Sequence, residues 1–303
     1  ILTINTGSSI ICIFLFLFSN LAIMVVITFT LCLLIVSSIL ADNGTDLVIQ
    51  ALVILSCLIC FGVSIISLLI SKWMVKRMTC ALVIFNPRSN MEKWLINIVE
   101  KQAEIVGIKM PEVAIFPSAA MNAFATGASK NKALMAVSQG LLDNMTRGEI
   151  EAVVGHEMSH IANGDMVTMA LVQGVVNTFV VFLSRIIGHV VDRVILKNSH
   201  GHGIGYFVTV MVSQVVLSVL ASTIVMYFSR QREFVADTGG ADLAGHQNMI
   251  GALKRLGQVE PEALPEQMAA LGINDKGGFM ALFSSHPPIE TRIEALENRA
   301  KNR

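Results

Sequence analysis

The sequence has 303 residues, of which 53% are hydrophobic and only 15% are charged, and its formal net charge is zero. A water-soluble domain usually has about 25% charged residues, so this composition argues against an ordinary soluble protein and indicates a membrane protein. Because there is neither a basic excess nor a basic run, nucleic acid is not expected as a partner.

Four apolar blocks account for the high hydropathy. They cover residues 10–40, 47–71, 166–184 and 204–228, and none of them contains a charged residue. Crossing a bilayer takes roughly 20 apolar residues, so we expect each successive pair of blocks to form a transmembrane hairpin. For the second pair, partial burial within protein is the alternative to a full span.

These blocks divide the chain into four regions: a transmembrane hairpin (1–71), a catalytic region (72–165), a second membrane hairpin (166–228) and a helical C-terminal region (229–303). Residues 1–71 contain no Lys or Arg, whereas Lys72, Lys76 and Arg77 follow at once. The positive-inside rule therefore predicts that the catalytic region lies in the cytoplasm. The second hairpin returns the chain to the same side.

The catalytic region contains an HExxH motif formed by His156, Glu157 and His160. On an α-helix, two histidines four residues apart lie on one face and can bind one ion. Glu157 is rotated by ~100° from His156, so its carboxylate can act on water instead of the metal. This pattern is typical of zinc peptidases, in which a fourth position stays open for water.

Both ends of the motif's helix can be predicted. Thr146 and Glu149 have the spacing of a capping box, and apolar residues at helical spacing follow them. Gly164 is a suitable C-terminal stop. The motif should therefore lie in the middle of an amphipathic helix, as its geometry requires.

Catalytic zinc needs a third protein ligand, and Glu233, which follows the fourth apolar block, fits best. Asp237 is four residues further along and lies on the same helix face, where it can accept the ring N–H of a ligand histidine. The alternative for Glu233 is an ordinary charge at the membrane border. Four other residues compete as ligands: Asp165, Asp242, His246 and His286.

At this point the chain resembles the HtpX-type membrane zinc metalloproteases, relatives of the CAAX prenyl endopeptidases. The resemblance covers nearly the whole chain and rests on residues 122–127, 155–161, 232–237 and 285–293. It implies a mainly α-helical membrane protein with a cytoplasmic α+β, zincin-like (gluzincin) domain and a small sheet. It also implies one Zn²⁺ per chain, with His156, His160 and Glu233 as ligands and Glu157 as the base.

Two further segments have expected roles. Residues 113–116 and 133–138 should be strands, and the segment between them resembles the family's substrate-binding edge: Asn122, Ala123, Phe124 and Ala125. A plain surface turn is the alternative for that segment. His286 is a candidate oxyanion donor or a resting-state cap on the zinc, or simply the start of a helix over 289–300. Arg292 is a candidate brace for the site.

The predicted function is zinc-dependent endoproteolysis of membrane or misfolded proteins on the cytoplasmic side, in membrane protein quality control, at the bacterial cytoplasmic (inner) membrane. Expected partners are the polypeptide substrate and the lipid bilayer, and a homo-oligomer or a regulatory membrane partner is left open. Two rival functions are a zinc-binding membrane scaffold without turnover and a prenyl-protein processing enzyme. The charged residues just before the motif, Arg147, Glu149 and Glu151, argue against a protease with its motif inside a spanning helix.

Overall fold

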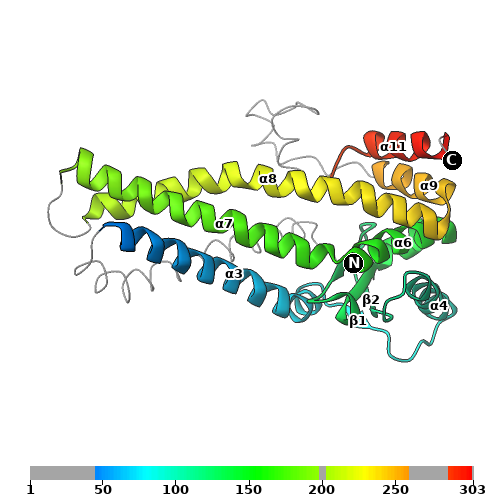
Figure 1. Ribbon diagram of the computed structural model, residues 1–303. Coiled ribbons are helices and arrows are strands. Elements are labelled where there is room, and N and C mark those ends of the chain that lie inside the picture. Colours follow the sequence, from blue (N-terminus) through cyan, green and yellow to red (C-terminus); the bar gives the residue numbers. More distant parts are fainter. Residues whose placement is uncertain (1–44, 198–202, 259–285, 302–303) are drawn as a thin grey trace. The chain divides into compact units, whose positions relative to one another are not determined.

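The computed structural model describes residues 45–197, 203–258 and 286–301. The expected span over residues 10–40 lies outside them. The helices are α3 (Thr45–Met78), α4 (Asn90–Ile105), α5 (Gln139–Asn144), α6 (Arg147–Asn163), α7 (Asp165–Val190), α8 (Ile204–Ala244), α9 (His246–Gly257) and α11 (Ile289–Lys301). The strands are β1 (Leu82–Val83), β2 (Glu112–Phe116), β3 (Ala123–Thr126) and β4 (Leu134–Ser138). This is the mainly helical protein with a small sheet that the sequence predicted (Figure 1).

The described residues form two compact units. The first consists of residues 45–66, 173–197 and 203–219, which come from α3, α7, the π-helical segment Val191–Ile195 that follows α7, and α8. Its helices pack closely at small residues, because a Cβ added to Gly188 would lie 2.4 Å from Cγ2 of Val210. Large apolar side chains such as Leu58 and Phe179 point outward, with exposed fractions of 68% and 58%. Such a surface suits lipid better than water.

Three helices among the described residues are long and apolar enough to cross a membrane. These candidate spans are Leu52–Met78, Asp165–Ile195 and Ile204–Ala244. The third runs without interruption beyond the apolar block at 204–228, so one helix carries both that block and Glu233.

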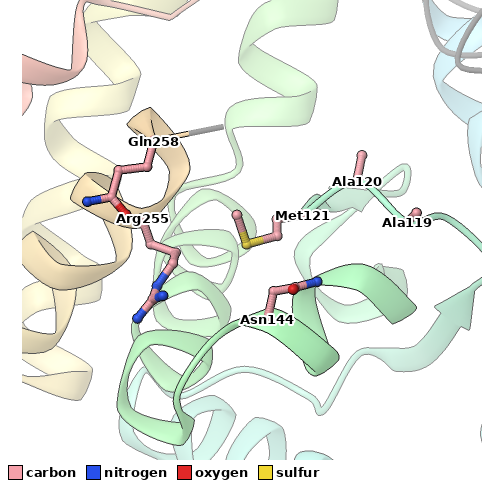
Figure 2. Close-up of a pocket in the computed structure, with 6 residues that line it drawn as sticks. All are labelled: Ala119, Ala120, Met121, Asn144, Arg255 and Gln258. Carbon is pink, nitrogen blue, oxygen red and sulfur yellow. The ribbon is translucent and has the colours of Figure 1, made fainter. Parts of the chain in front are cut away.

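The second unit contains the sheet, with strand order β1-β2-β4-β3. β2 and β4 are parallel, whereas β3 is antiparallel to β4 and β1 is antiparallel to β2. In the part of the chain that the structure describes, no strand lies outside β3, so β3 is an edge strand. The segment leading into β3 borders a recess, with Met121 pointing toward it (Figure 2).

α6 lies in the core of this second unit, between the sheet and α9. Its apolar face is fully buried at Ile150, Val154 and Met158. The predicted capping box is confirmed: the backbone N of Thr146 donates to Oε2 of Glu149 at 2.8 Å. The predicted stop is confirmed as well, because the helix ends at residue 163 and Gly164 has a left-handed φ of 70°.

Two glycines allow α6 and α8 to approach each other. A Cβ added to Gly155 of α6 would lie 3.2 Å from Cα of Gly240 in α8. A Cβ added to Gly240 would lie 3.0 Å from the backbone N of His156 and 3.1 Å from the carbonyl O of Ala152. A side chain at either position would therefore push against the backbone of the other helix, and this close packing affects how near Glu233 comes to the histidines.

Replacing Gly240 with Ala should therefore destabilise the protein, although Ala is the better helix former. Overpacking costs about 1–3 kcal/mol, which exceeds the gain of about 1 kcal/mol in helix propensity. Gly251→Ala in α9 is the matched control, because its Cβ would meet only the Glu149 side chain, at 3.5 Å. Thermal unfolding of the metal-free proteins in detergent should show a lower Tm for the first variant only. Equal shifts would contradict the close contact.

Candidate metal centre

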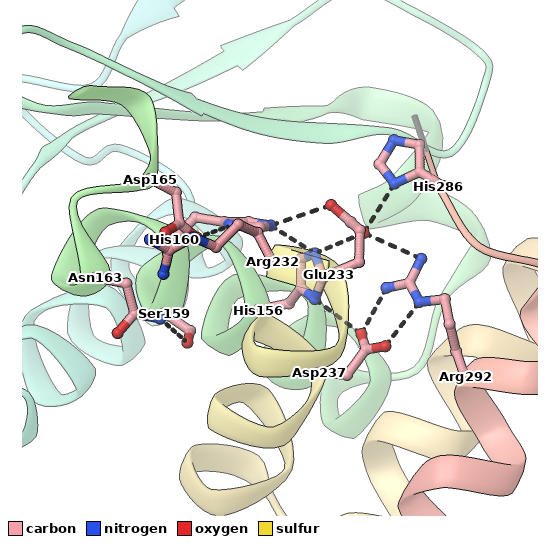
Figure 3. Close-up of polar contacts among 10 residues, drawn as sticks. All are labelled: His156, Ser159, His160, Asn163, Asp165, Arg232, Glu233, Asp237, His286 and Arg292. Atoms are coloured by element: carbon pink, nitrogen blue, oxygen red, sulfur yellow. Dashed lines mark hydrogen bonds and ion pairs between the residues drawn. The ribbon is translucent and has the colours of Figure 1, made fainter. Parts of the chain in front are cut away.

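Three side chains from α6 and α8 converge at one point (Figure 3). Nε2 of His156 and Nε2 of His160 are 3.2 Å apart. Oε1 of Glu233 is 3.4 Å from Nε2 of His160, and its Oε2 is 3.6 Å from Nε2 of His156. The structure thus brings together the two histidines of the motif and the glutamate that the sequence favoured as the third ligand.

Each histidine has a carboxylate behind it. Nδ1 of His156 is 3.0 Å from Oδ1 of Asp237, and Nδ1 of His160 is 2.7 Å from Oδ2 of Asp165. A carboxylate next to Nδ1 favours the tautomer in which Nδ1 holds the proton and Nε2 carries the lone pair. Both lone pairs are then directed toward Glu233.

These three groups fit a tetrahedral metal ion. Ligand atoms about 2.1 Å from a tetrahedral ion are about 3.4 Å from one another, and the three observed separations lie between 3.2 and 3.6 Å. Two neutral imidazoles and one carboxylate form a typical donor set for such an ion. In the metal-binding state, the two Nε2 lone pairs and the Glu233 carboxylate all face the same point, and a cation can bind there.

Arg292 of α11 holds two of the carboxylates. Its Nε donates to Oδ2 of Asp237 at 2.7 Å, and its Nη1 lies 3.3 Å from Oε2 of Glu233. Arg292 is buried, and burial alone would lower its pKa, but its hydrogen bonds to Asp237 and the charges of Asp237 and Glu233 outweigh burial and raise the pKa. The guanidinium therefore stays charged and contacts both α8 carboxylates; its role as a brace stays a prediction.

His286 lies at the outer side of the site. Its Nδ1 is 2.8 Å from Oε2 of Glu233, and its side chain is 62% exposed. It therefore contacts the ligand carboxylate while facing solvent, a position compatible with either role expected for it.

A small cleft leads to the metal centre. It has a volume of about 180 Å³, and its lining includes Glu157, His160 and Glu233 together with Ala125 of the edge strand β3. The half-buried Glu157 carboxylate thus lies beside the ligands at a surface that water can reach. This arrangement places an acid–base group and an edge strand at the same opening.

The electrostatic field at the site favours positive charge. Burial disfavours the charged form of His160, but hydrogen bonds to Asp165 and Glu233 outweigh burial and raise the pKa of His160 to about 10. At neutral pH the metal-free site therefore holds a proton on His160, which a metal must displace. Metal affinity should consequently fall as the pH falls.

The other sequence candidates occupy different places. Asp242 pairs with Arg299 at 3.2 Å, and His246 begins α9; neither belongs to the group of convergent ligand atoms. Phe124 packs against Phe116 on the opposite face of the sheet, with ring centroids 5.3 Å apart, so it does not reach the cleft. The sequence indicated Asp165 only as a competing ligand, whereas it contacts the outer nitrogen of His160.

The comparisons with known proteins agree with this geometry. Residues 89–300 match peptidase family M48. The chain is 56% identical over 285 residues to Protease HtpX of Nitrosococcus oceani, covering 93% of this chain and 97% of that protein. It is 57% identical over 286 residues to Protease HtpX of Pseudoalteromonas atlantica, covering 94% of this chain and 98% of that one.

A solved structure shares the fold. The crystal structure of S. mikatae Ste24p matches with a TM-score of 0.66 and 18% sequence identity, over 97% of this chain and 67% of that chain. At this identity the likeness establishes the fold alone.

Removing the carboxylate behind His160 should weaken metal binding without removing a ligand. We expect Asp165→Ala to lower the affinity about 10–100-fold, because Nδ1 of His160 loses its acceptor. Competition with a chromophoric chelator in detergent measures the affinity. Asp242→Ala is the control, since it removes an acidic residue of α8 that lies outside the ligand group. Equal affinities for the Asp165 variant and the wild type would contradict this role.

Proposed function

The chain belongs to peptidase family M48, and we propose that it is a zinc-dependent endopeptidase that cleaves membrane or unfolded proteins at the cytoplasmic face of a bacterial inner membrane. The observation that carries this proposal is the spacing of the His156, His160 and Glu233 ligand atoms, with Glu157 beside them. Quality control of membrane proteins is the cellular role that suits such an enzyme.

Zinc is the metal that this donor set suits best. Two imidazoles and a glutamate are the ligands of several zinc peptidases, and the fourth position remains open. Held by His156, His160 and Glu233, Zn²⁺ would supply Lewis-acid activation of water and of the scissile carbonyl. Asp165, Asp237 and Arg292 hold the ligands in place for it.

Glu157 is the proposed acid–base group. Its carboxylate would take a proton from the attacking water and pass it to the amine that leaves when the peptide bond breaks. His286 extends into solvent next to Glu233 and would donate a hydrogen bond to the oxyanion. Glu157 lines the cleft that leads to the ligands, where a substrate would enter.

The edge strand β3 is the proposed substrate-binding strand. The carbonyl of Asn122 accepts from the backbone N of Ser138 in β4. Because the backbone groups of successive strand residues point to alternate sides, the groups of Ala123 and Ala125 face the open edge. An extended substrate can pair with them, and Ala125 also lines the metal cleft. Pairing at Ala123 and Ala125 would hold a peptide bond beside the ligands.

Replacing Glu157 with Gln should keep the metal and abolish cleavage. Loss of a general base costs about 10²–10⁴-fold in rate, while His156, His160 and Glu233 are unchanged. Wild type and variant would be purified in detergent with chelator and reloaded with zinc. Cleavage of casein and metal content would then be measured.

Glu151→Gln, on the same helix, is the control and should cut as the wild type does. A Glu157→Gln variant that still cleaves would refute the mechanism. If the wild type also binds one zinc and cleaves nothing, the zinc-binding scaffold becomes the better account.

The proposed orientation can be tested at Cys80, which is exposed and follows the positive residues at the end of α3. A membrane-impermeant maleimide should label Cys80 in inverted membrane vesicles and not in intact spheroplasts. Cys80→Ser is the control for labelling at other cysteines. Labelling of Cys80 in spheroplasts would place the catalytic region outside the cytoplasm.

A further inference from the structure

A second recess lies at the beginning of β3 and shares no residue with the metal cleft. It has a volume of about 350 Å³ and is lined by Ala119, Ala120, Met121, Asn144, Arg255 and Gln258 (Figure 2). These residues come from the segment before β3, the end of α5 and the end of α9. All the polar side chains in the lining can donate hydrogen bonds, and Arg255 brings the only formal charge.

The guanidinium of Arg255 is only partly engaged. Its Nε and Nη2 are each 3.4 Å from Oε1 of Glu149, which is long for a charged pair. The other oxygen of Glu149 already accepts from the backbone of Thr146 in the capping box. The Arg255 side chain is also 40% exposed. Arg255 can therefore donate to a further carboxylate at the recess.

The recess lies along the line that a bound substrate would follow. β3 runs from Ala123, next to the recess, to Thr126, whose hydroxyl is 3.0 Å from the hydroxyl of Ser71 in α3. Ala125 lines the metal cleft. Met121 is four residues before Ala125, which corresponds to about 13 Å of extended chain. A peptide paired with β3 and cut at the metal would thus extend to the recess.

The direction of the substrate follows from the pairing. Antiparallel strands pair slightly more stably per residue than parallel ones. A substrate antiparallel to β3 passes Thr126 first and Ala123 later, so residues after the cut bond would lie toward the recess. In this direction, the substrate residues that reach the recess are those on the C-terminal side of the cut bond.

We propose that this recess is a specificity subsite in which Arg255 binds a substrate carboxylate roughly four residues beyond the scissile bond, on its C-terminal side. The carboxylate can belong to an Asp or Glu side chain or to the end of the substrate chain. The amides of Asn144 and Gln258 would add neutral donors. This inference rests on the proposed function, since it needs a substrate paired along β3.

The test compares peptides that differ only at this position. Two amidated peptides with Glu or Gln four residues after the cleaved bond would be cut by the zinc-loaded full chain in detergent. We expect kcat/KM to favour Glu about fivefold, as for a partly exposed charged pair. Arg255→Gln should bring the Glu-to-Gln ratio of kcat/KM to one. Arg255→Glu should make this ratio smaller than one and should favour a third peptide, with Lys at the same position. Because each ratio is taken within one variant, any loss common to both peptides cancels.

The control is Lys254→Gln, which removes the same charge from the exposed neighbouring position and should keep the wild-type ratio. A further pair of peptides ends at the fourth position with a neutral residue, one as the free acid and one as the amide. Faster cleavage of the free acid would show that the recess binds the carboxylate at the end of a chain as well as that of a side chain. Equal cleavage of all these peptides, or an acidic preference only before the cut bond, would overturn the subsite and leave the protease standing.

If the wild type cuts none of the peptides, that result counts against the proposed function instead. Binding of the labelled Glu and Gln peptides to the Glu157→Gln variant, followed by fluorescence anisotropy, then tests the recess without turnover. Tighter binding of the Glu peptide, lost in the double variant with Arg255→Gln, would support the subsite. Equal binding would overturn it.

Discussion

The close approach of α6 and α8 is the constraint on which the metal centre depends. Gly155 of α6 faces Gly240 of α8 where the two helices come close. Glu233 lies seven residues before Gly240, two helical turns away and on the same face. His156 follows Gly155 directly, so the crossing point fixes the distance between a histidine of one helix and the carboxylate of the other. A side chain at either glycine would change that distance, although the ligand residues themselves would be unchanged.

The buried charges around the site serve orientation more than stability. Burying an ion pair costs desolvation that its attraction only partly offsets, and here Asp165, Glu233 and Asp237 are all buried, alongside Arg292. Each acts on a neighbour whose direction matters: Asp237 and Asp165 contact the Nδ1 atoms of the two ligand histidines, and Arg292 contacts Asp237 and Glu233. The surplus of negative charge also explains why the metal-free site retains a proton on His160. A bound cation would balance that charge, so metal binding and stability should be coupled.

The sequence predicted what local spacing determines. The HExxH helix, its capping box and its glycine stop follow from patterns within 20 residues, and Glu233 and Asp237 share a face because they are four residues apart. The bidentate contact of Arg292 with Asp237 joins residues 55 positions apart, and the recess at Arg255 joins three separate segments. Hydrophobic periodicity along the sequence does not predict contacts between residues so far apart. β1 was missed because two residues give no alternation, and Asp165 was predicted only as a competing ligand because its proximity to His160 depends on the turn at Gly164.

That turn also determines how the site is connected to the rest of the chain. α6 ends at residue 163, Gly164 adopts the left-handed conformation, and α7 begins at Asp165. One residue therefore separates the helix that carries His160 from the helix whose first side chain contacts that histidine. On the other side, Glu233 belongs to the same unbroken helix as the apolar residues 204–228. Each half of the metal centre thus belongs to, or directly adjoins, a helix with a long apolar segment.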